Sequence, residues 1–431
     1  MIKNKIYKEI LAYSHTMTNQ GNVLVIKGGY LIDGTGKEPI EDAVLVIRGK
    51  EIVNIGKEST IEIPSSAHVI DASGMTIMPG LIDCHVHLSG SRSVNPLERL
   101  RVPRYLRILR ASVDARKLIE AGFTTVRDVG SPFGPALRDA IAEGTIPGPR
   151  ILAAGRPISQ TFGHGDIHYL PYHWVKEIAV LADGPYECRK AVRLVLRDGV
   201  DLIKICTSGG VFSEKDEPTW PQFTLEEINA IVDEAHRVGK RVAAHAEGWE
   251  GIKNAILGNV DTIEHGDEID EELAEMMIKR NKILVPTMAI DDAMVKHGDK
   301  AGIPSWAMRK IRKLREINIR NYQKAYKAGV KMALGTDFGG PDIFPMGKNA
   351  IELELRVKLV GVKEMDAIMQ ATKIAAEALG LEDKIGTIEK GKLADIIIVE
   401  GNPLKDITVL QKLDKIKVVI KEGSIVVNKY Q

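Results

Sequence analysis

Cysteine is scarce in this sequence. The 431 residues include three cysteines, Cys84, Cys188 and Cys206, and none of them forms a CxxC pair. A sparse, odd set argues against a disulfide framework and is typical of a reducing compartment. Long apolar runs are also missing, because no window reaches the ~18 residues of a membrane span and the first twenty residues lack the apolar core of a signal peptide. These absences predict a cytoplasmic protein with no membrane partner.

An excess of charge of either sign is absent too. Lys and Arg number 59 against 58 Asp and Glu, which leaves a formal charge of +1. This balance gives no electrostatic case for a nucleic-acid partner. With 44% hydrophobic and 27% charged residues, the chain has the composition of a globular protein with a sizeable core, and its length suits one large barrel plus a smaller domain.

The two ends of the chain show the same sequence pattern. Short apolar runs alternate with turn formers over residues 23–75 and again over residues 394–427, with no long helical period. This pattern predicts β-strands. We therefore expect residues 23–77 and 384–431 to build one small β-sandwich domain, preceded by an N-terminal extension of residues 1–22.

The middle of the chain alternates between strand-like and helix-like segments. Apolar runs recur at residues 81–88, 123–129, 150–155, 201–206, 241–246, 261–265, 283–288 and 331–336. Amphipathic stretches of helical length include residues 225–238, 271–282 and 311–328. Thr224 followed by Glu226 and Glu227 predicts a helix start, and Gly239 a helix end. Eight strands with intervening helices predict an α/β fold, a (β/α)8 TIM barrel over residues 78–383.

Six ionisable or metal-ligating residues fall at or near the ends of these predicted strands. In TIM barrels such positions converge on one mouth. They are His85, His87, Lys204, His245, His265 and Asp337.

Two of these features point to metal chemistry. His85 and His87 are two residues apart at a strand end, so they point the same way and suit a metal such as zinc. Lys204 lies between Ile203 and Ile205, where burial disfavours the ammonium form. A neutral amine can react with carbon dioxide to give a carbamate, whose two oxygens can bridge two metal ions. A lysine that pairs with a nearby carboxylate is the structural alternative.

The order of these six residues resembles the binuclear pattern of the amidohydrolase superfamily. The similarity covers essentially the whole chain, including Met78-Pro-Gly-Leu-Ile-Asp and Gly386-Thr-Ile-Glu-Lys-Gly-Lys-Leu-Ala-Asp. Phrases such as Gly163-His-Gly-Asp and Ala244-His-Ala-Glu-Gly are similar to a prolidase-like subgroup. That subgroup includes Xaa-Pro dipeptidases, arginine/lysine carboxypeptidases and ochratoxin-hydrolysing amidases, and is related to imidazolonepropionases.

The resemblance implies a role for each residue. His85, His87 and Asp337 would hold one zinc ion, His245 and His265 a second, and N6-carboxylated Lys204 would bridge them. A metal-bridging hydroxide would attack the carbonyl, and Asp337 would act as general base and then acid. The implied reaction is hydrolysis of amide C–N bonds in dipeptides or N-acyl amino acids. Relatives of this kind also imply a homo-oligomer.

Further residues are candidates for substrate contact. His164 follows the third strand between two glycines and is expected to hydrogen-bond a substrate carbonyl or carboxylate. Ser208 and Gly209 follow Lys204 and are expected to offer backbone N–H groups to an anionic end.

Some alternative activities remain possible, whereas a deaminase and an inactive scaffold are disfavoured. A cyclic amidase of the imidazolonepropionase kind is the main alternative, and a lactonase or phosphotriesterase side activity fits the same chemistry. A deaminase of this fold would need a glutamate at position 248, which is glycine, and we expect Glu247 to face away from His245. A scaffold without activity would lack the six ligand positions, which are all present.

Overall fold

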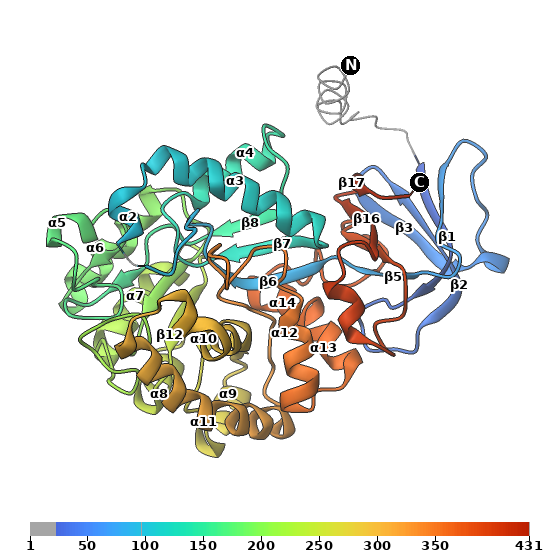
Figure 1. The fold of residues 1–431 in the computed structure, drawn as a ribbon. Coiled ribbons are helices and arrows are strands. Elements are labelled where there is room, and N and C mark those ends of the chain that lie inside the picture. The colour runs from blue at the N-terminus through green and yellow to red at the C-terminus, as the bar shows by residue number, and fades with distance from the viewer. Residues whose placement is uncertain (1–22, 96, 431) are drawn as a thin grey trace.

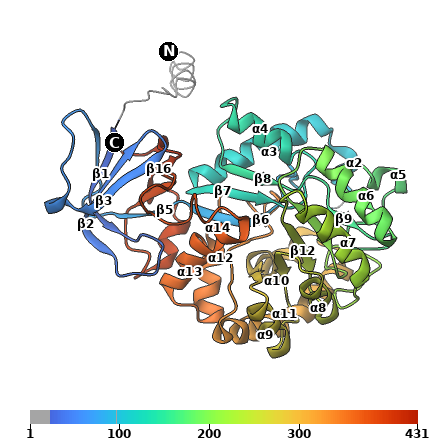
Figure 2. The same cartoon turned by 180° about the vertical axis from the view of Figure 1, so that it is seen from behind.

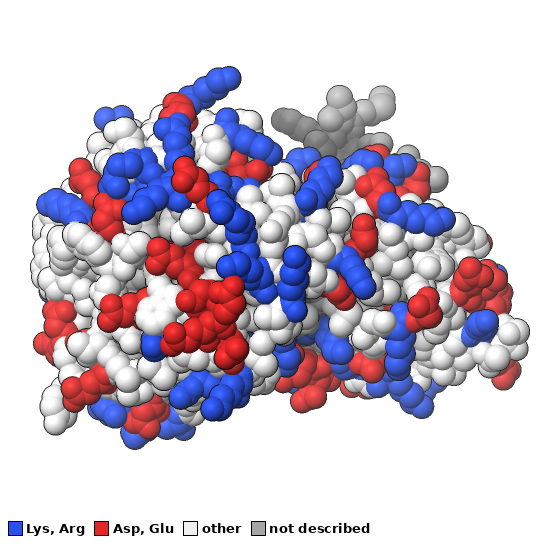
Figure 3. All heavy atoms as spheres, turned by 90° about the horizontal axis from the view of Figure 1, so that it is seen from below, with Lys and Arg blue, Asp and Glu red and all other residues white. Residues whose placement is uncertain are grey.

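The computed structural model describes residues 23–95 and 97–430, which form an α/β body with a β-rich region beside it (Figure 1). Helices lie on the outside of the parallel strands of the larger body, as the view from behind also shows (Figure 2). Basic and acidic side chains are interspersed over the face drawn in Figure 3. Within the described residues, no helix is both long enough and apolar enough to cross a bilayer.

Strands from both ends of the chain share one sheet. Its order is β17-β16-β15-β5-β1-β2-β3, with β4 paired to β1. The strands are β1 (Val23–Leu31), β2 (Ile40–Arg48), β3 (Glu51–Lys57), β4 (His68–Asp71), β5 (Thr76–Pro79), β15 (Ile396–Val399), β16 (Ile416–Lys421) and β17 (Ser424–Asn428).

This sheet encloses a common core. Ile26 of β1, Leu45 of β2, Ile396 of β15 and Val418 of β16 are fully buried in one apolar cluster. Because β5 pairs with β15 on one side and with β1 on the other, the hydrogen bonds make one continuous sheet. The ends of the chain therefore fold around a shared core as predicted, but in a single sheet in place of the two sheets of a sandwich.

The remaining strands are parallel and form two sheets. A three-stranded sheet has the order β6-β7-β8, and a six-stranded sheet the order β10-β9-β11-β12-β13-β14. Their bounds are β6 (Leu81–Val86), β7 (Phe123–Asp128), β8 (Arg150–Ala153), β9 (Ile158–Ser159), β10 (Val180–Leu181), β11 (Ile203–Cys206), β12 (Val242–Ala246), β13 (Thr262–His265) and β14 (Ile283–Val285).

The eighth predicted strand, residues 331–336, is irregular. The segment still lies between β14 and β6, since Ala333 N donates to Leu284 O (2.8 Å) and Cys84 N to Leu334 O (2.8 Å). Its end departs from strand geometry, because Asp337 has a positive φ of 59° and both Thr336 N and Asp337 N approach the carbonyl of His85. Backbone hydrogen bonds thus connect the two parallel sheets on this side without one closed, continuous sheet being formed.

Helices alternate with the parallel strands. They are α2 (Glu98–Arg101), α3 (Arg104–Glu120), α4 (Gly134–Ala142), α5 (Tyr172–Val175), α6 (Gly184–Arg197), α7 (Leu225–His236), α8 (Trp249–Leu257), α9 (Glu271–Lys279), α10 (Met288–Ala301), α11 (Ser305–Ala328), α12 (Ile351–Leu355), α13 (Glu364–Gln370) and α14 (Lys373–Leu379), with short helical turns η1 (Glu58–Thr60), η2 (Arg356–Val360) and η3 (Ile407–Gln411).

The start of α7 shows how local sequence sets these boundaries. Thr224 accepts a hydrogen bond from Glu227 N, and the Glu227 carboxylate accepts one from Thr224 N. This reciprocal pair satisfies two N–H groups that the first helical turn leaves free. The helix start predicted at Thr224 is confirmed.

Candidate metal centre

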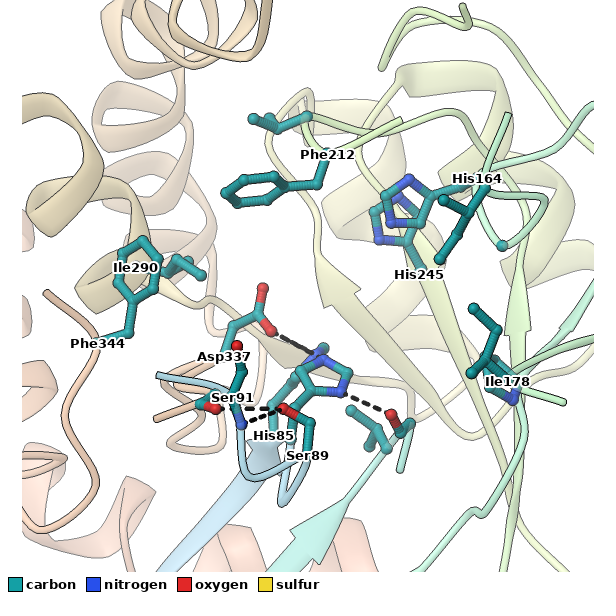
Figure 4. Close-up of a pocket in the computed structure, with 18 of the residues that line it drawn as sticks. His85, Ser89, Ser91, His164, Ile178, Phe212, His245, Ile290, Asp337 and Phe344 are labelled. Carbon is teal, nitrogen blue, oxygen red and sulfur yellow. Dashed lines mark hydrogen bonds and ion pairs between the residues drawn. The ribbon is translucent and has the colours of Figure 1, made fainter. Parts of the chain in front are cut away.

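A cavity of about 320 Å³ opens at the carboxyl ends of the parallel strands. His164 and His245 lie on one side of it, His85 and Asp337 on another, and Phe344, Ile290 and Phe212 across from them (Figure 4). All six residues predicted at strand ends line this cavity: His85, His87, Lys204, His245, His265 and Asp337.

The first group of possible ligands consists of His85, His87 and Asp337. His87 Nε2 lies 3.0 Å from Asp337 Oδ1, and His85 Nε2 lies 3.5 Å from the same oxygen. Burial opposes ionisation of Asp337, but the two histidines outweigh it and hold the pKa of that carboxyl below its ordinary value. Asp337 therefore stays ionised and can serve as a ligand or as a base.

The second group brings His245, His265 and Glu247 together. One possible ligand atom from each of the three lies within 4.8 Å of the others. The rings of His245 and His265 meet edge to face with centroids 4.6 Å apart. Burial lowers the pKa of both histidines well below 6.5, so both offer a neutral ring nitrogen.

Protein oxygens fix the orientation of these rings. The Gly209 carbonyl accepts from His245 Nε2 (2.9 Å), which leaves His245 Nδ1 with a free lone pair. Glu264 accepts from His85 Nδ1 (2.7 Å), which leaves His85 Nε2 free. A hydrogen bond at one ring nitrogen that frees the other is the arrangement of metal-binding histidines.

The remaining two rings are held in the same way. His87 Nδ1 lies 3.3 Å from the carbonyl oxygen of Gly130, and His265 Nδ1 lies 2.8 Å from the hydroxyl of Thr287. In both histidines Nε2 is the nitrogen left for the cavity. All four imidazoles are thus oriented before any ligand binds.

Lys204 lines the same cavity as the two groups. Its side chain is 5% exposed, and Nζ has no hydrogen-bond partner among the described residues. Its strand, β11, pairs with β12, which carries His245, and burial followed by nearby charges, that of Lys204 among them, lowers the pKa of His85, His245 and His265. Burial also lowers the pKa of Lys204 itself, which favours the neutral amine.

Two of the six residues have unusual backbone conformations. His265 has a φ of 69° and Asp337 a φ of 59°, in the left-handed region that side chains with a Cβ seldom adopt. Such strain persists only where the surrounding structure enforces it, and it is often found at functional sites. Here it turns both side chains into the cavity at the point where each strand ends.

His164 lines the cavity as predicted. Its ring stacks on His245 at a centroid distance of 4.1 Å and an angle of 6°, and Nδ1 lies 2.8 Å from Ser213 Oγ. Burial lowers the pKa of His164 to about 4, so it acts as a neutral hydrogen-bonding group.

The structure places Ser208 and Gly209 behind the cavity wall. Gly209 N donates to the carbonyl of Trp220 (2.9 Å), while the Gly209 carbonyl holds His245. Ser208 Oγ accepts from Glu247 N (2.9 Å). The Gly209 carbonyl and the Ser208 hydroxyl thus orient His245 and Glu247, the Gly209 N–H is bonded within the protein, and neither residue is among those that line the cavity.

Sequence reasoning missed a group of carboxylates in the cavity. The expectation that Glu247 faces away from His245 is wrong, because residues two apart in a strand share a face; Glu247 Oε1 lies 3.4 Å from His245 Nε2. Asp267, two residues after His265, and Asp291 also line the cavity. The same i, i+2 spacing could have identified Glu247 and Asp267.

These carboxylates repel one another. Burial, followed by the charges of Asp267 and Asp291, raises the pKa of Glu247 well above its ordinary value. Burial raises the pKa of Asp267 to about 6 and that of Asp291 well above its ordinary range.

The residues fit a pair of metal ions. Four oriented imidazoles and a carboxylate are ligands typical of zinc, and a buried amine without a partner lines the same cavity. A cavity at the carboxyl ends of parallel strands is where the active sites of α/β barrel enzymes lie.

The chain belongs to the amidohydrolase family, which its residues 76–426 match. Ochratoxinase of Aspergillus niger is 35% identical over 435 residues, covering 95% of this chain and 87% of that protein. The crystal structure of A. niger ochratoxinase is similar to this chain with a TM-score of 0.86 and 33% identity, over 95% of this chain and 96% of that one.

Two further relatives differ in their named activities. The structure of a Xaa-Pro dipeptidase with bound methionine gives a TM-score of 0.85 at 37% identity, over 94% of this chain and 99% of that one. Imidazolonepropionase of Rhizobium rhizogenes is 28% identical over 390 residues, covering 84% of this chain and 88% of that protein. The predicted family and its prolidase-like subgroup are confirmed.

Proposed function

We propose that the protein hydrolyses amide C–N bonds in dipeptides or N-acyl amino acids with the help of two zinc ions. The observation that carries this proposal is the buried, unpartnered amine of Lys204 in the cavity that two groups of oriented histidines also line. The similarity to an ochratoxinase and a Xaa-Pro dipeptidase supports an amide as the substrate class.

Each metal ion has its own ligands in this proposal. His85, His87 and Asp337 would hold one ion, His245 and His265 would hold the other, and N6-carboxylated Lys204 would be a ligand that the two ions share. The neutral amine that burial favours is the form that reacts with carbon dioxide. Metal ions bound there supply a nucleophile from water near neutral pH and polarise the amide carbonyl.

The protein's own side chains then move protons and orient the substrate. Asp337 is ionised and lies in the cavity, so it accepts a proton from the attacking water and passes it to the leaving amine. His164 is neutral and held by Ser213, and it orients the substrate through its ring N–H group. Ile290, Phe344 and Phe212 give the cavity an apolar part of its wall.

The proposal extends to the architecture. Residues 78–383 form the barrel and residues 23–77 with 384–431 the small domain, with the hydrogen bonds of residues 331–338 as support for closure. Three free, buried cysteines support a cytoplasmic protein. We also propose a homo-oligomer, on the resemblance to its relatives alone.

A cyclic amidase is the second candidate. It is favoured by the 28% identity to an imidazolonepropionase over 84% of the chain. Both candidates use the same metal-binding residues, so only substrates separate them.

One experiment tests both candidates. Protein expressed with zinc is analysed for metal and assayed against dipeptides, N-acyl amino acids, cyclic amides, lactones and phosphotriesters. We expect two ions per chain and the highest kcat/KM on the open-chain amides. One ion per chain at full activity would refute the binuclear site, and faster turnover of cyclic amides would establish the second candidate.

A further inference from the structure

One end of the cavity is lined by three carboxylates from neighbouring elements. Glu247 follows β12, Asp267 follows β13 and Asp291 belongs to α10. Glu247 and Asp267 are each 4% exposed. We call these three residues the acidic end of the cavity.

Two of these carboxylates are held by hydrogen bonds from α11. Asp267 Oδ1 accepts from Asn318 Nδ2 (3.1 Å) and from the hydroxyl of Tyr322 (2.8 Å), and Asp291 Oδ2 accepts from the same Asn318 nitrogen (2.8 Å). Asn318 and Tyr322 are buried, so these bonds fix both carboxylates in place. Hydrogen bonds from α11 therefore fix the positions of two of the three carboxyl groups of the acidic end.

Glu247 differs from these two residues because one of its carboxyl oxygens lacks a hydrogen-bond partner among the described residues. That oxygen, Oε2, is buried. A buried carboxylate oxygen without a partner is costly, since it has lost water and gained no donor. Because Glu247 lines the cavity, a group bound there can supply the missing donor.

Two basic residues near the acidic end, Lys310 and Arg315, do not line the cavity. Buried Lys310 lies 3.4 Å from Asp216 Oδ1 and also donates to the carbonyl of Gly210. Arg315 approaches Asp292 at 3.6 Å and attracts Asp267 and Asp291, but it is not among the residues that line the cavity. The acidic end thus contributes three carboxyl groups to the lining of the cavity and no basic side chain.

We propose that the acidic end is a subsite for the free α-amino group of the substrate's N-terminal residue, with Glu247 as its central ligand. The inference rests on the proposed amide hydrolysis and narrows its substrates to those with a positively charged nitrogen beside the scissile carbonyl. An ammonium group supplies three N–H donors, one of which can meet the unpartnered oxygen of Glu247, and its positive charge favours the ionised form of the neighbouring carboxyl groups.

The position of Glu247 selects an α-amino group over a more distant cation. Its Oε1 lies 3.4 Å from Nε2 of His245, and both residues line the cavity, so the subsite adjoins the metal-binding histidines. An α-amino nitrogen is about 2.5 Å from the carbonyl carbon of its own residue, by standard bond lengths. The ammonium group of a C-terminal lysine side chain is many bonds further from that carbon.

Matched substrates test this subsite. Zinc-loaded wild-type protein is assayed on Ala-Leu, N-acetyl-Ala-Leu and N-acetyl-Ala-Lys, and so are the variants Glu247→Gln and Asp299→Asn. The second variant is a control, because Asp299 is an exposed carboxylate on α10 that pairs with Arg312. Metal content is measured for each protein, and calorimetry measures binding of methylguanidinium, a cation that remains protonated and does not coordinate metal ions.

We expect the wild type and Asp299→Asn to prefer Ala-Leu over its N-acetyl form by kcat/KM. Glu247→Gln should lower kcat/KM for Ala-Leu by about 10- to 100-fold, the range for losing a hydrogen bond between charged groups, and change that for N-acetyl-Ala-Leu by less than about threefold. It should also weaken methylguanidinium binding and keep both metal ions.

Two kinetic results would refute the proposed subsite: equal rates of the wild type on Ala-Leu and its N-acetyl form, or a preference for N-acetyl-Ala-Lys that Glu247→Gln abolishes. Two binding results would also refute it: equal methylguanidinium binding by the wild type and Glu247→Gln, or loss of a metal ion in Glu247→Gln. If no amide is cleaved at all, the proposed function fails, and the methylguanidinium titration decides on the subsite independently.

Discussion

Replacing Lys204 with methionine should have opposite effects on stability and on activity. In metal-free protein without bicarbonate, Lys204 Nζ is a buried amine with no hydrogen-bond partner among the described residues. Such a group costs about 1–3 kcal/mol, and a methionine side chain of similar length fills the same space without it. With an unfolding entropy of about 2.1 cal/mol/K per residue, this corresponds to a rise in Tm of about 1–3 °C for a chain of this length.

The gain in stability of metal-free Lys204→Met over the wild type should decrease as the pH rises. Burial lowers the pKa of Lys204 below 10.5 in the folded protein, so between that lowered value and 10.5 the unfolded chain binds more protons than the folded one. The stability contributed by this site in the wild type therefore rises with pH through that window, and Lys204→Met lacks the rise. The advantage of Lys204→Met should be larger at pH 7 than at pH 9.5.

With zinc bound, the wild type should be more stable than Lys204→Met. Two bound ions stabilise the folded wild type, whereas Lys204→Met loses the bridge and should lose metal and several orders of magnitude in activity. Scanning calorimetry at both pH values, with and without zinc, measures these effects, and exposed Lys300→Met on α10 serves as the control. A metal-free Lys204→Met protein that melts below the wild type, or one that keeps two ions and full activity, would refute the reasoning.

Three further variants probe individual roles by steady-state kinetics and metal titration. Asp337→Asn should lower kcat by at least ~10² with KM little changed, because the proton acceptor is lost; near-normal kcat would place the proton transfer elsewhere. His164→Ala should raise KM for substrates with a free α-carboxylate more than for their amides, and an equal effect on both would limit His164 to the scissile carbonyl. Glu264→Gln removes the carboxylate that holds His85 Nδ1 and should weaken zinc binding by about 10- to 100-fold, so unchanged affinity would argue against that orienting role.

Much of the fold could be predicted from apolar periodicity. The runs that begin at residues 81, 123 and 150 correspond to β6, β7 and β8, because a continuous apolar run between turn formers is typical of a buried parallel strand. The two-residue strands β9 and β10 were missed, since so short a segment has no period. The irregular eighth segment was also beyond prediction from its apolar residues, because its geometry depends on the left-handed backbone at Asp337.

The metal ligands could be predicted because each stands at the end of such a run. The groups that orient them could not be, since they come from distant parts of the chain. Arg127 on β7 donates to Glu264 on β13 (2.7 Å), and Glu264 in turn holds His85 on β6. No spacing along the chain joins these residues, and only the packing of three strands brings them together.

The acidic end of the cavity illustrates a different limit. Glu247 and Asp267 could have been placed beside His245 and His265 from strand alternation alone, but Asp291 and Asn318 lie on helices whose facing cannot be inferred from a strand pattern. The charge of the subsite therefore emerges only when α10 and α11 pack over the strand ends. Because the metal ligands come from the strands and Asp291 and Asn318 from the helices, substitutions in α10 and α11 can change which substrate is bound while the metal centre stays intact. This separation is why metal content and substrate preference must be measured together in each variant of the acidic end.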